Sequence, residues 1–235
     1  MMDGRESDIE RGAGDAQSFY GRWALLYDLL ATRTPGIGSL RERAAAVLRL
    51  DPGDTVVEMG CGTGANLPYL REQVGPEGTV VGIDFTRPVL DRARATVAEY
   101  DNVHLVRGDA ASPPVEEPVD AVLATFVVGM LDGPAGAVDD WCDLLSEGGH
   151  LVLVDAGSSD SDRAYARLVD AAFRAVVVLS TPPTTQLRYD RDPQALLDRR
   201  VADARDALGA RAEALADERR ALGVVRLTGG RIAPP

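Results

Sequence analysis

The chain has no lysine: all 25 basic residues among its 235 are arginine, and 37 acidic residues bring the net charge to −12. Aromatic residues make up only 5%. An acidic surface without lysine stays hydrated when salt screens charge repulsion, which is typical of proteins from salt-loving organisms. Such a surface disfavours broad contact with nucleic acid, because phosphates require cationic partners. The charge therefore indicates habitat more than partner, and we predict no nucleic-acid partner.

Other absences narrow the class of protein. No apolar run is long enough for a membrane-spanning helix, and the charged N-terminus lacks the apolar core of a secretion signal. Two cysteines, Cys61 and Cys142, cannot build a disulfide framework, so we predict reduced thiols and a cytoplasmic protein. The two histidines, His104 and His150, form no catalytic pair, and we interpret both as structural. No Cys/His cluster has metal-ligand spacing, so no metal is expected.

The most informative segment is a strand that ends in a glycine-rich loop. From Val56 the sequence predicts a buried strand with an acidic residue, Glu58, at its end; glycines follow within residues 60–64, and Asn66 begins a helix. Glycine allows positive φ and close approach of a ligand, and a helix N-terminus favours an anionic group. A second strand over 79–83 ends in Asp84, where an acid can accept both hydroxyls of a ribose. The Gly-x-Gly-x-Gly spacing differs from that of dinucleotide-binding dehydrogenases, which it disfavours.

Strands and helices alternate as far as residue 156. This alternation predicts an α/β fold: a doubly wound, mostly parallel sheet of six or seven strands, with ligands at the carboxyl ends of the strands. The expected elements are helix 38–49 with Ser39 as N-cap, helix 88–100 with Pro88 in its first turn, strand 103–107, strand 119–126, helix 134–146, a turn at Gly148-Gly149 and strand 150–155.

We predict a disordered segment over 1–15 and one domain over 16–235. In that domain, 50–156 would form the cofactor-binding core and 157–222 a helical acceptor or cap region. The cap would contain an amphipathic helix over 161–179, a loop over 181–185, and a long charged helix over 193–222 that Gly209 kinks or interrupts. The long helix leaves several interpretations open: a helix packed on the domain, a substrate cap, a homodimer seam, or a surface that touches lipid. Two terminal prolines predict a short or missing last strand.

Five segments together resemble the class I S-adenosylmethionine-dependent methyltransferases, in order and in spacing. They are residues 58–64 (EMGCGTG), 82–84 (GID), 107–110 (RGDA), 119–122 (VDAV) and 147–153 (EGGHLVL). Five elements in register are far more specific than one glycine loop. The resemblance covers roughly residues 50–156 and implies a Rossmann-like sheet that binds S-adenosylmethionine.

Two flanking segments resemble a narrower group, the ubiquinone/menaquinone-type and phospholipid N-methyltransferases. They are the N-terminal segment from Phe19 to Asp28 and the Leu-Thr-Gly-Gly sequence over 227–230. Tyr20, Trp23 and Tyr27 share one helix face. This face holds the helix to the core, or, as the resemblance implies, belongs to an N-terminal helical lid over the cofactor. The arginine-rich stretch of the quinone enzymes is not recognisable here, which weakens the assignment of a quinone acceptor.

The resemblance also implies roles for individual residues. Asp84 would bind the ribose hydroxyls, Phe85 would flank the adenine, and Asp109 would accept its amino group. Glu58 would orient the glycine loop near the cofactor's ammonium group. The full set of expected cofactor contacts is Tyr20, Tyr27, Glu58, Met59, Gly60, Cys61, Gly62, Thr63, Gly64, Asp84, Phe85, Asp109, Ala110, Thr125 and Phe126.

Methyl transfer from a sulfonium requires alignment more than acid–base help. If a base is needed, the candidates are Asp155 and Tyr27. The sequence thus predicts a methyltransferase for a small or lipidic acceptor, either a quinone-ring carbon or a lipid head-group amine, with peripheral membrane contact as a further option. The alternative is a non-catalytic cofactor-binding module, or a partner subunit that assembles through the long C-terminal helix.

Overall fold

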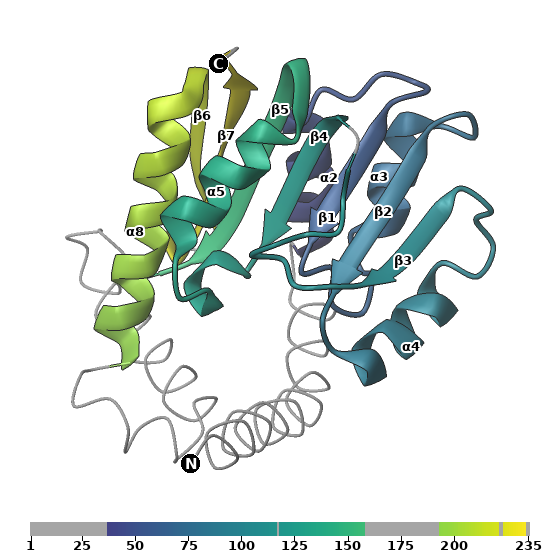
Figure 1. The fold of residues 1–235 in the computed structure, drawn as a ribbon, viewed down its shortest axis with the longest axis horizontal. Coiled ribbons are helices and arrows are strands. Elements are labelled where there is room, and N and C mark those ends of the chain that lie inside the picture. Colours follow the sequence, from purple (N-terminus) through teal and green to yellow (C-terminus); the bar gives the residue numbers. More distant parts are fainter. Residues whose placement is uncertain (1–36, 117, 158–192, 221–222, 234–235) are drawn as a thin grey trace, which may run out of the picture.

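The computed structural model describes residues 37–116, 118–157, 193–220 and 223–233 (Figure 1). The predicted lid with Tyr20 and Tyr27, the amphipathic helix 161–179 and the loop 181–185 lie outside these residues. No helix in the described ranges is long and apolar enough to cross a membrane.

Seven strands form a single sheet with the order β3-β2-β1-β4-β5-β7-β6. Strands β1 to β5 pair in parallel, whereas β7 lies antiparallel between β5 and β6. The predicted doubly wound fold is confirmed. The strands are β1 (Thr55–Met59), β2 (Thr79–Asp84), β3 (Val103–Arg107), β4 (Val119–Thr125), β5 (Leu145–Ala156), β6 (Ala212–Arg220) and β7 (Val225–Ile232).

Helices cover both faces of the sheet (Figure 1). On one face lie α2 (Ile37–Val47), α3 (Leu67–Val74) and α4 (Arg87–Thr96), and their buried residues share one apolar cluster. On the other face lie α5 (Pro134–Asp143) and α8 (Pro193–Arg211), which share a second cluster with the short 3-10 helix η1 (Val128–Met130). Because both faces are covered, a central strand such as β4 is almost continuously apolar.

The chain reverses its direction of winding at the centre of the sheet. Strand β1 pairs with β2 on one side and with β4 on the other, so the connections after these strands diverge. In open α/β sheets this divergence leaves a crevice at the carboxyl ends of the strands. The glycine loop follows β1 directly and therefore lies at this crevice.

Most elements of the core begin and end within a few residues of their predicted bounds. Strand β3 is as predicted, and Pro88 lies in the first turn of α4. Ser39 is not an N-cap, because α2 already includes Ile37. The turn expected at Gly148-Gly149 is an irregularity inside β5, whose register with β4 shifts by several residues; Gly148 has φ 84° there.

The prediction for the C-terminal region is wrong in two respects. Helix α8 ends at Arg211, and residues 212–220 form β6 instead of continuing the helix. The last strand is neither short nor missing: β7 has eight residues and lies inside the sheet, before the terminal prolines. A helical cap over 157–222 is therefore excluded for 212–220. Gly209 lies inside α8 and does not interrupt it.

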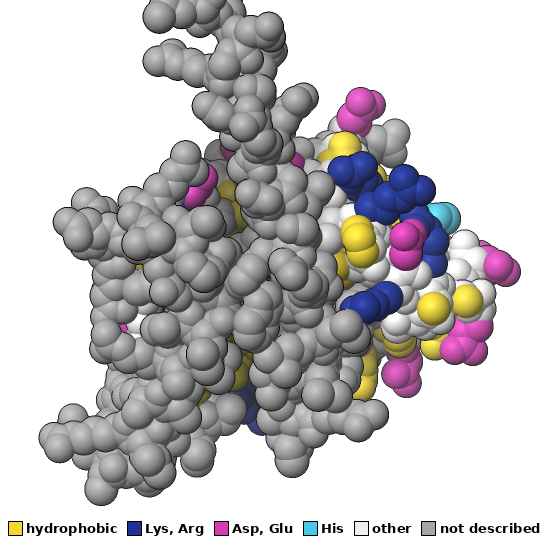
Figure 2. All heavy atoms as spheres, turned by 90° about the horizontal axis from the view of Figure 1, so that it is seen from below, with side chains coloured by type: hydrophobic (Ala, Val, Ile, Leu, Met, Phe, Trp, Pro, Cys, Tyr) yellow, Lys and Arg dark blue, Asp and Glu magenta, His cyan; other side chains and the backbone are white. Residues whose placement is uncertain are grey.

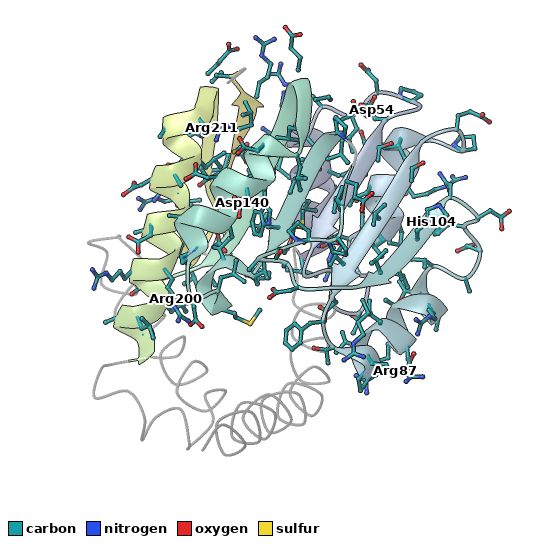
Figure 3. All side chains as sticks on the ribbon, in the orientation of Figure 1. Asp54, Arg87, His104, Asp140, Arg200 and Arg211 are labelled. Carbon is teal, nitrogen blue, oxygen red and sulfur yellow. The ribbon has the colours of Figure 1, made fainter. Side chains whose placement is uncertain are left out.

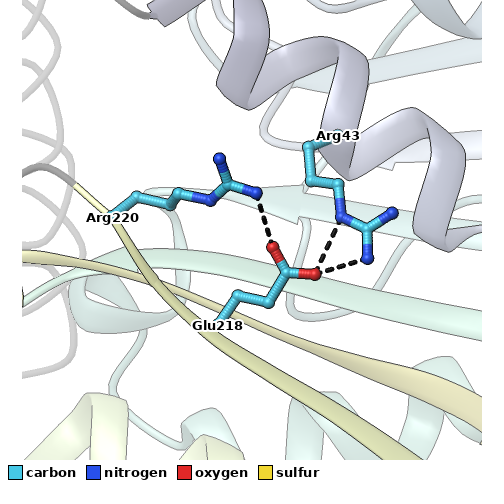
Figure 4. Close-up of polar contacts among 3 residues, drawn as sticks. All are labelled: Arg43, Glu218 and Arg220. Atoms are coloured by element: carbon cyan, nitrogen blue, oxygen red, sulfur yellow. Dashed lines mark hydrogen bonds and ion pairs between the residues drawn. The ribbon is translucent and has the colours of Figure 1, made fainter.

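Charge pairing explains why a segment with helical spacing is a strand. Asp217 of β6 meets Arg226 of β7 at 2.5 Å, and Arg231 of β7 donates to Glu213 of β6. On the other face, Glu218 accepts from Arg43 of α2 at 2.8 Å and from Arg220 at 2.7 Å (Figure 4). These cross-strand and helix–strand pairs form only in the folded sheet, so a local pattern cannot report them.

Helix α8 is packed on the domain, which confirms one of the interpretations of this segment. Val201, Ala204 and Leu208 are buried against the second apolar cluster. Two arginines of α8, both labelled in Figure 3, bind acids of neighbouring elements: Arg200 meets Asp132 after η1, and Arg211 meets Asp143 of α5.

Candidate active site

The glycine loop between β1 and α3 has a left-handed backbone at each glycine. Gly60, Gly62 and Gly64 have φ values of 66°, 56° and 77°. A Cβ on Gly60 would lie 2.7 Å from Val127, and one on Gly64 would lie 3.2 Å from Ala93. A Cβ on Gly62 would meet nothing within 4 Å. The outer two glycines thus allow the loop to pack, and the middle one faces open space where a ligand can approach the backbone.

Asp84 at the end of β2 holds this loop in place. Its Oδ2 accepts a hydrogen bond from Gly62 N at 3.1 Å, and its Oδ1 accepts one from Thr86 N at 2.8 Å. Burial raises the pKa of Asp84. The sequence predicted a ligand contact here but not this link between β2 and the loop.

Glu58 at the end of β1 is a buried carboxyl group. Only 1% of its surface is exposed, and burial raises its pKa to about 8. Asn66 donates to Glu58 Oε1, and the same Nδ2 lies 3.2 Å from Thr125 Oγ1 of β4. Within the described residues, no group forms a hydrogen bond with Glu58 Oε2. A buried acceptor without a partner suits a cationic or hydrogen-bonding ligand.

Asn66 is a site residue that the sequence did not reveal. It precedes α3, the position where a cap is expected, yet its side chain makes no cap hydrogen bond. Its side chain is buried, and its Oδ1 accepts from Arg41 Nε of α2 at 3.1 Å. The only signal in the sequence was a polar amide directly after the glycine loop, which a capping role also explains.

A cavity of about 370 Å³ opens beside the loop. Phe85, Arg107, Gly108 and Asp109 line it. Phe85 is 43% exposed, and Arg107 Nε donates to the Phe85 carbonyl at 3.2 Å. Figure 2 views the edge where the parallel strands end; on its coloured part, basic side chains gather beside apolar ones. An aromatic ring, a guanidinium and a carboxylate suit a flat ligand ring with polar edges.

Asp109 and Ala110 form the floor of this region. Asp109 Oδ1 accepts from Ala111 N at 2.9 Å, so the carboxylate stabilises a turn and also borders the cavity. The Ala110 carbonyl accepts a 2.7 Å hydrogen bond from Trp141 Nε1, and Trp141 is fully buried in α5. The indole therefore fixes the turn from the opposite face of the sheet, a role the sequence did not reveal.

The segment after β4 brings a strained residue to the same edge. Phe126 has φ 57°, which is unfavourable for a bulky side chain, and its N donates to the Val154 carbonyl at 2.7 Å. The next residue, Val127, packs against Gly60. Thr125 and Phe126 thus lie next to the glycine loop, and their contact with the cofactor stays a prediction.

Four other predicted residues present no free side chain to the loop's ligand side: Met59, Cys61 and Thr63 precede or belong to the loop, and Asp155 lies apart from it. Met59 is fully buried, and the Cys61 thiol is buried with a raised pKa, so both are suited to ligand contact through the backbone only. Thr63 accepts from Thr96 Oγ1 through its carbonyl. Asp155, the candidate base, is 1% exposed and lies near Arg205 of α8; burial raises its pKa to about 7.

The strand order, the inserted antiparallel β7 and the glycine loop at the switch point define the class. This arrangement is the fold of the class I S-adenosylmethionine-dependent methyltransferases. Residues 56–149 match the family described as "Methyltransferase domain".

Two curated relatives are similar in sequence. An arsenite methyltransferase of Halobacterium salinarum is 29% identical over 182 residues, which are 67% of this chain and 46% of that protein. A demethylmenaquinone methyltransferase of Listeria monocytogenes is 29% identical over 140 residues, covering 58% of this chain and 59% of the relative. The chain thus spans about half the length of these relatives.

Two solved structures share the fold. A SAM-dependent methyltransferase from Aquifex aeolicus is 18% identical with a TM-score of 0.56, covering 85% of this chain and 94% of that one. The CurJ carbon methyltransferase is 16% identical with a TM-score of 0.62, covering 88% and 57%. At these identities the likeness concerns the fold alone.

Proposed function

We propose that this protein transfers the methyl group of S-adenosylmethionine to a small or lipidic acceptor. The observation that carries the proposal is the convergence of the glycine loop, the buried Glu58 and the loop-holding Asp84 at the switch point of a methyltransferase-type sheet. When bound, the cofactor supplies an electrophilic methyl group on a positively charged sulfur.

The residues present fit this cofactor in two places. Gly62 leaves space for the methionine portion, and the buried Oε2 of Glu58 can accept from its amino group. The cavity beside Phe85 and Asp109 suits the adenine ring, with the Ala110 amide as a further donor. Asp84 lies between the two places, where its remaining lone pairs can accept the ribose hydroxyls.

The protein's own contribution would be alignment and exclusion of water. The rigid loop, held by Asp84 and by Val127 behind Gly60, supplies a fixed surface for the methyl donor. Asp155 remains a proposed base for acceptors that must lose a proton, because a pKa of about 7 suits proton transfer near neutral pH. Its burial beside α8 makes it a weaker candidate than the sequence indicated. Tyr27 lies outside the described residues.

For the acceptor we favour a quinone-ring carbon or a lipid head-group amine, as the resemblance in the flanking segments implies. An arsenite acceptor is disfavoured on chemical grounds. Trivalent arsenic binds thiolates, and the two cysteines, Cys61 and Cys142, are both buried with raised thiol pKa values. The alternative of a non-catalytic subunit loses support, because the C-terminal helix on which it rested ends at Arg211 and packs on the domain.

Calorimetry at high salt tests the cofactor assignment. S-adenosylmethionine or its demethylated product should bind in the micromolar range, about −7 to −8 kcal/mol. Saturable binding of a nicotinamide dinucleotide, with no binding of either sulfur compound, would overturn the proposal.

A second experiment identifies the acceptor. The protein is incubated with methyl-labelled S-adenosylmethionine and, in parallel, with a total lipid extract, a demethylated quinone or arsenite. We expect label in the lipid or the quinone fraction. Label in the arsenite arm alone would contradict the acceptor class while leaving methyl transfer intact.

A further inference from the structure

One side chain joins four elements beneath the glycine loop. Asn66 precedes α3, donates to Glu58 of β1, contacts Thr125 of β4 and accepts from Arg41 of α2. It is 8% exposed. A side-chain amide can donate two hydrogen bonds and accept two, and no other residue of this size does both without a charge.

We propose that Asn66 is the positioning residue of Glu58: it holds the carboxyl group through one oxygen and thereby reserves the other for the cationic amino group of the methyl donor. This inference rests on the proposed function, because it assigns the free oxygen to that donor. The geometry behind it is independent of any ligand. Oε1 accepts from Asn66, whereas Oε2 is buried with no partner in the described part of the chain.

The charges around Glu58 act in opposite directions. Burial raises its pKa most strongly, and the nearby carboxylate of Asp84 raises it further. The Asn66 hydrogen bond and the positive charge of Arg41 lower it. The Cys61 thiol of the loop also lies close enough to feel the carboxylate. Asn66 thus stabilises the ionised carboxylate directly, and it also connects Glu58 to Arg41.

This arrangement predicts a pH-dependent affinity. With a pKa of about 8, Glu58 is mostly protonated at pH 7 and cannot pair fully with a cation. The affinity for the methyl donor should therefore rise with pH towards pH 8, until the α-amino group of the donor loses its own proton. Removal of the Asn66 donor raises the pKa of Glu58 again, so the same rise should occur at a higher pH.

The test compares the parent with Asn66→Ala, with Arg41→Gln and with the control Asn102→Ala. Asn102 also makes half-buried amide contacts, to the carbonyls of Gly75 and Gly78, and it is not among the groups that shift the pKa of Glu58. The Glu58 carboxyl carbon is titrated by ¹³C NMR in the ligand-free protein, and S-adenosylmethionine affinity is measured by calorimetry between pH 6 and 9.5.

We expect Asn66→Ala to raise two midpoints by about one pH unit: that of the Glu58 carboxyl titration and that of the pH-dependent affinity. At pH 7 the affinity should fall roughly tenfold. Arg41→Gln, which removes the positive charge from a half-buried position of α2, should move them in the same direction by less. Asn102→Ala should move neither. Equal weakening at every pH by Asn66→Ala, or no midpoint shift in Asn66→Ala and Arg41→Gln alike, would overturn the inference.

The two arms separate this inference from the proposed function. If the parent binds no S-adenosylmethionine, the proposed function fails, while the carboxyl titration still shows whether Asn66 controls Glu58. If Asn66→Ala does not fold, Asn66→Ser replaces the amide by a shorter hydroxyl side chain, and its Glu58 carboxyl midpoint should lie above that of the parent. A parent-like midpoint in Asn66→Ser and Arg41→Gln alike would reject the positioning role.

Discussion

The carboxylate of Asp84 has two roles: it holds the glycine loop in place, and we propose that it binds the ribose of the cofactor. One oxygen holds the glycine loop through Gly62 N and the other holds Thr86 N. Replacement by alanine would therefore loosen the loop as well as remove the proposed ribose contact. Asparagine keeps one oxygen acceptor, replaces the other by an NH2 group that faces a backbone N–H, and loses the charge, so Asp84→Asn disturbs the loop less than alanine does.

We expect Asp84→Asn to remain folded and to lose S-adenosylmethionine affinity by about tenfold to a hundredfold, or roughly 1.5–3 kcal/mol, because a charge-assisted contact is lost. Calorimetry measures the affinity, and thermal melting checks the fold. Asp140→Asn, at an exposed position of α5, makes the same change of charge as a control. Parent-like affinity in Asp84→Asn would show that the acid only holds the loop.

Trp141 supports the proposed adenine region from behind the sheet. Its indole N–H donates to the Ala110 carbonyl, and phenylalanine cannot. Trp141→Phe should cost about 1–3 kcal/mol of stability for the unpaired carbonyl, and should weaken S-adenosylmethionine binding several-fold. Val138→Ala, on the same helix and also buried, removes packing without touching Ala110. Urea unfolding and calorimetry on both variants should show a loss of stability in each, but a loss of affinity only in Trp141→Phe.

Residue patterns predicted the parts of the site that lie in continuous segments. The glycine loop, Asp84 and Asp109 each follow a strand, and parallel strands bring these ends to one edge. Asn66 and Trp141 could not be found in this way. Asn66 has the sequence of a helix cap, and Trp141 lies about thirty residues from the carbonyl that it binds. Their roles exist only once the helices are packed on the sheet.

At the scale of elements, the parallel core was predictable. The antiparallel pair of β6 and β7, here called the C-terminal half-sheet, was not. Buried parallel strands have nearly uninterrupted apolar sequences, which is why β1 and β4 were recognised. Edge strand β6 is charged and mostly exposed, and its apolar residues also fit a helical spacing. Its pairing with β7 decides its conformation. That pairing joins residues 212–220 to residues 225–232, which a pattern within the segment itself does not include.

The Gly229-Gly230 pair of β7 makes this half-sheet possible. A Cβ on Gly230 would lie 2.0 Å from the Ala214 carbonyl oxygen of β6, and one on Gly229 would lie 2.6 Å from Val152 of β5. We expect Gly230→Ala to destabilise the protein by about 2–4 kcal/mol, since backbone must move to relieve the overlap. Denaturant unfolding measures the loss.

Gly209 in α8 is the matched control for this substitution. It is exposed, and a Cβ there would meet nothing within 4 Å. Gly209→Ala should therefore stabilise the protein by about 0.5–1 kcal/mol, because alanine is the better helix former. If Gly230→Ala were as harmless as Gly209→Ala, the close approach of β6 to β7 would be wrong.

Among the described residues, the acids with shifted pKa values divide into two kinds. Those at the surface of the C-terminal half-sheet are paired with arginine, and the pKa of Glu218 falls to about 2 and that of Asp217 falls as well. The buried acids at the ends of the parallel strands behave in the opposite way. Burial raises the pKa of Glu58 to about 8 and that of Asp155 to about 7. The acids that are costly to ionise thus lie at the carboxyl ends of the parallel strands, where we propose that the ligand binds.

This division predicts that stability falls as the pH rises from 6.5 to 8. In that interval the folded protein retains protons on Glu58 and Asp155, whereas the unfolded chain has lost them, because its carboxyl groups titrate near pH 4. The surface pairs of Asp217 and Glu218 are fully ionised there and contribute no slope. Burial lowers the pKa of His150, which gives an opposite slope that is smaller and fades as the pH rises above about 6.5.

The expected loss between pH 6.5 and 8 is about 2 kcal/mol in the free energy of unfolding, with the larger share from Glu58, whose pKa is higher. Urea unfolding of the ligand-free protein at fixed salt measures it. Glu58→Gln should remove most of the slope and Asp155→Asn a smaller part, because a neutral amide has no proton to lose. A parent whose stability is level or rises over this interval would show that these carboxyl groups are ionised, and hence solvated or paired, in the folded protein.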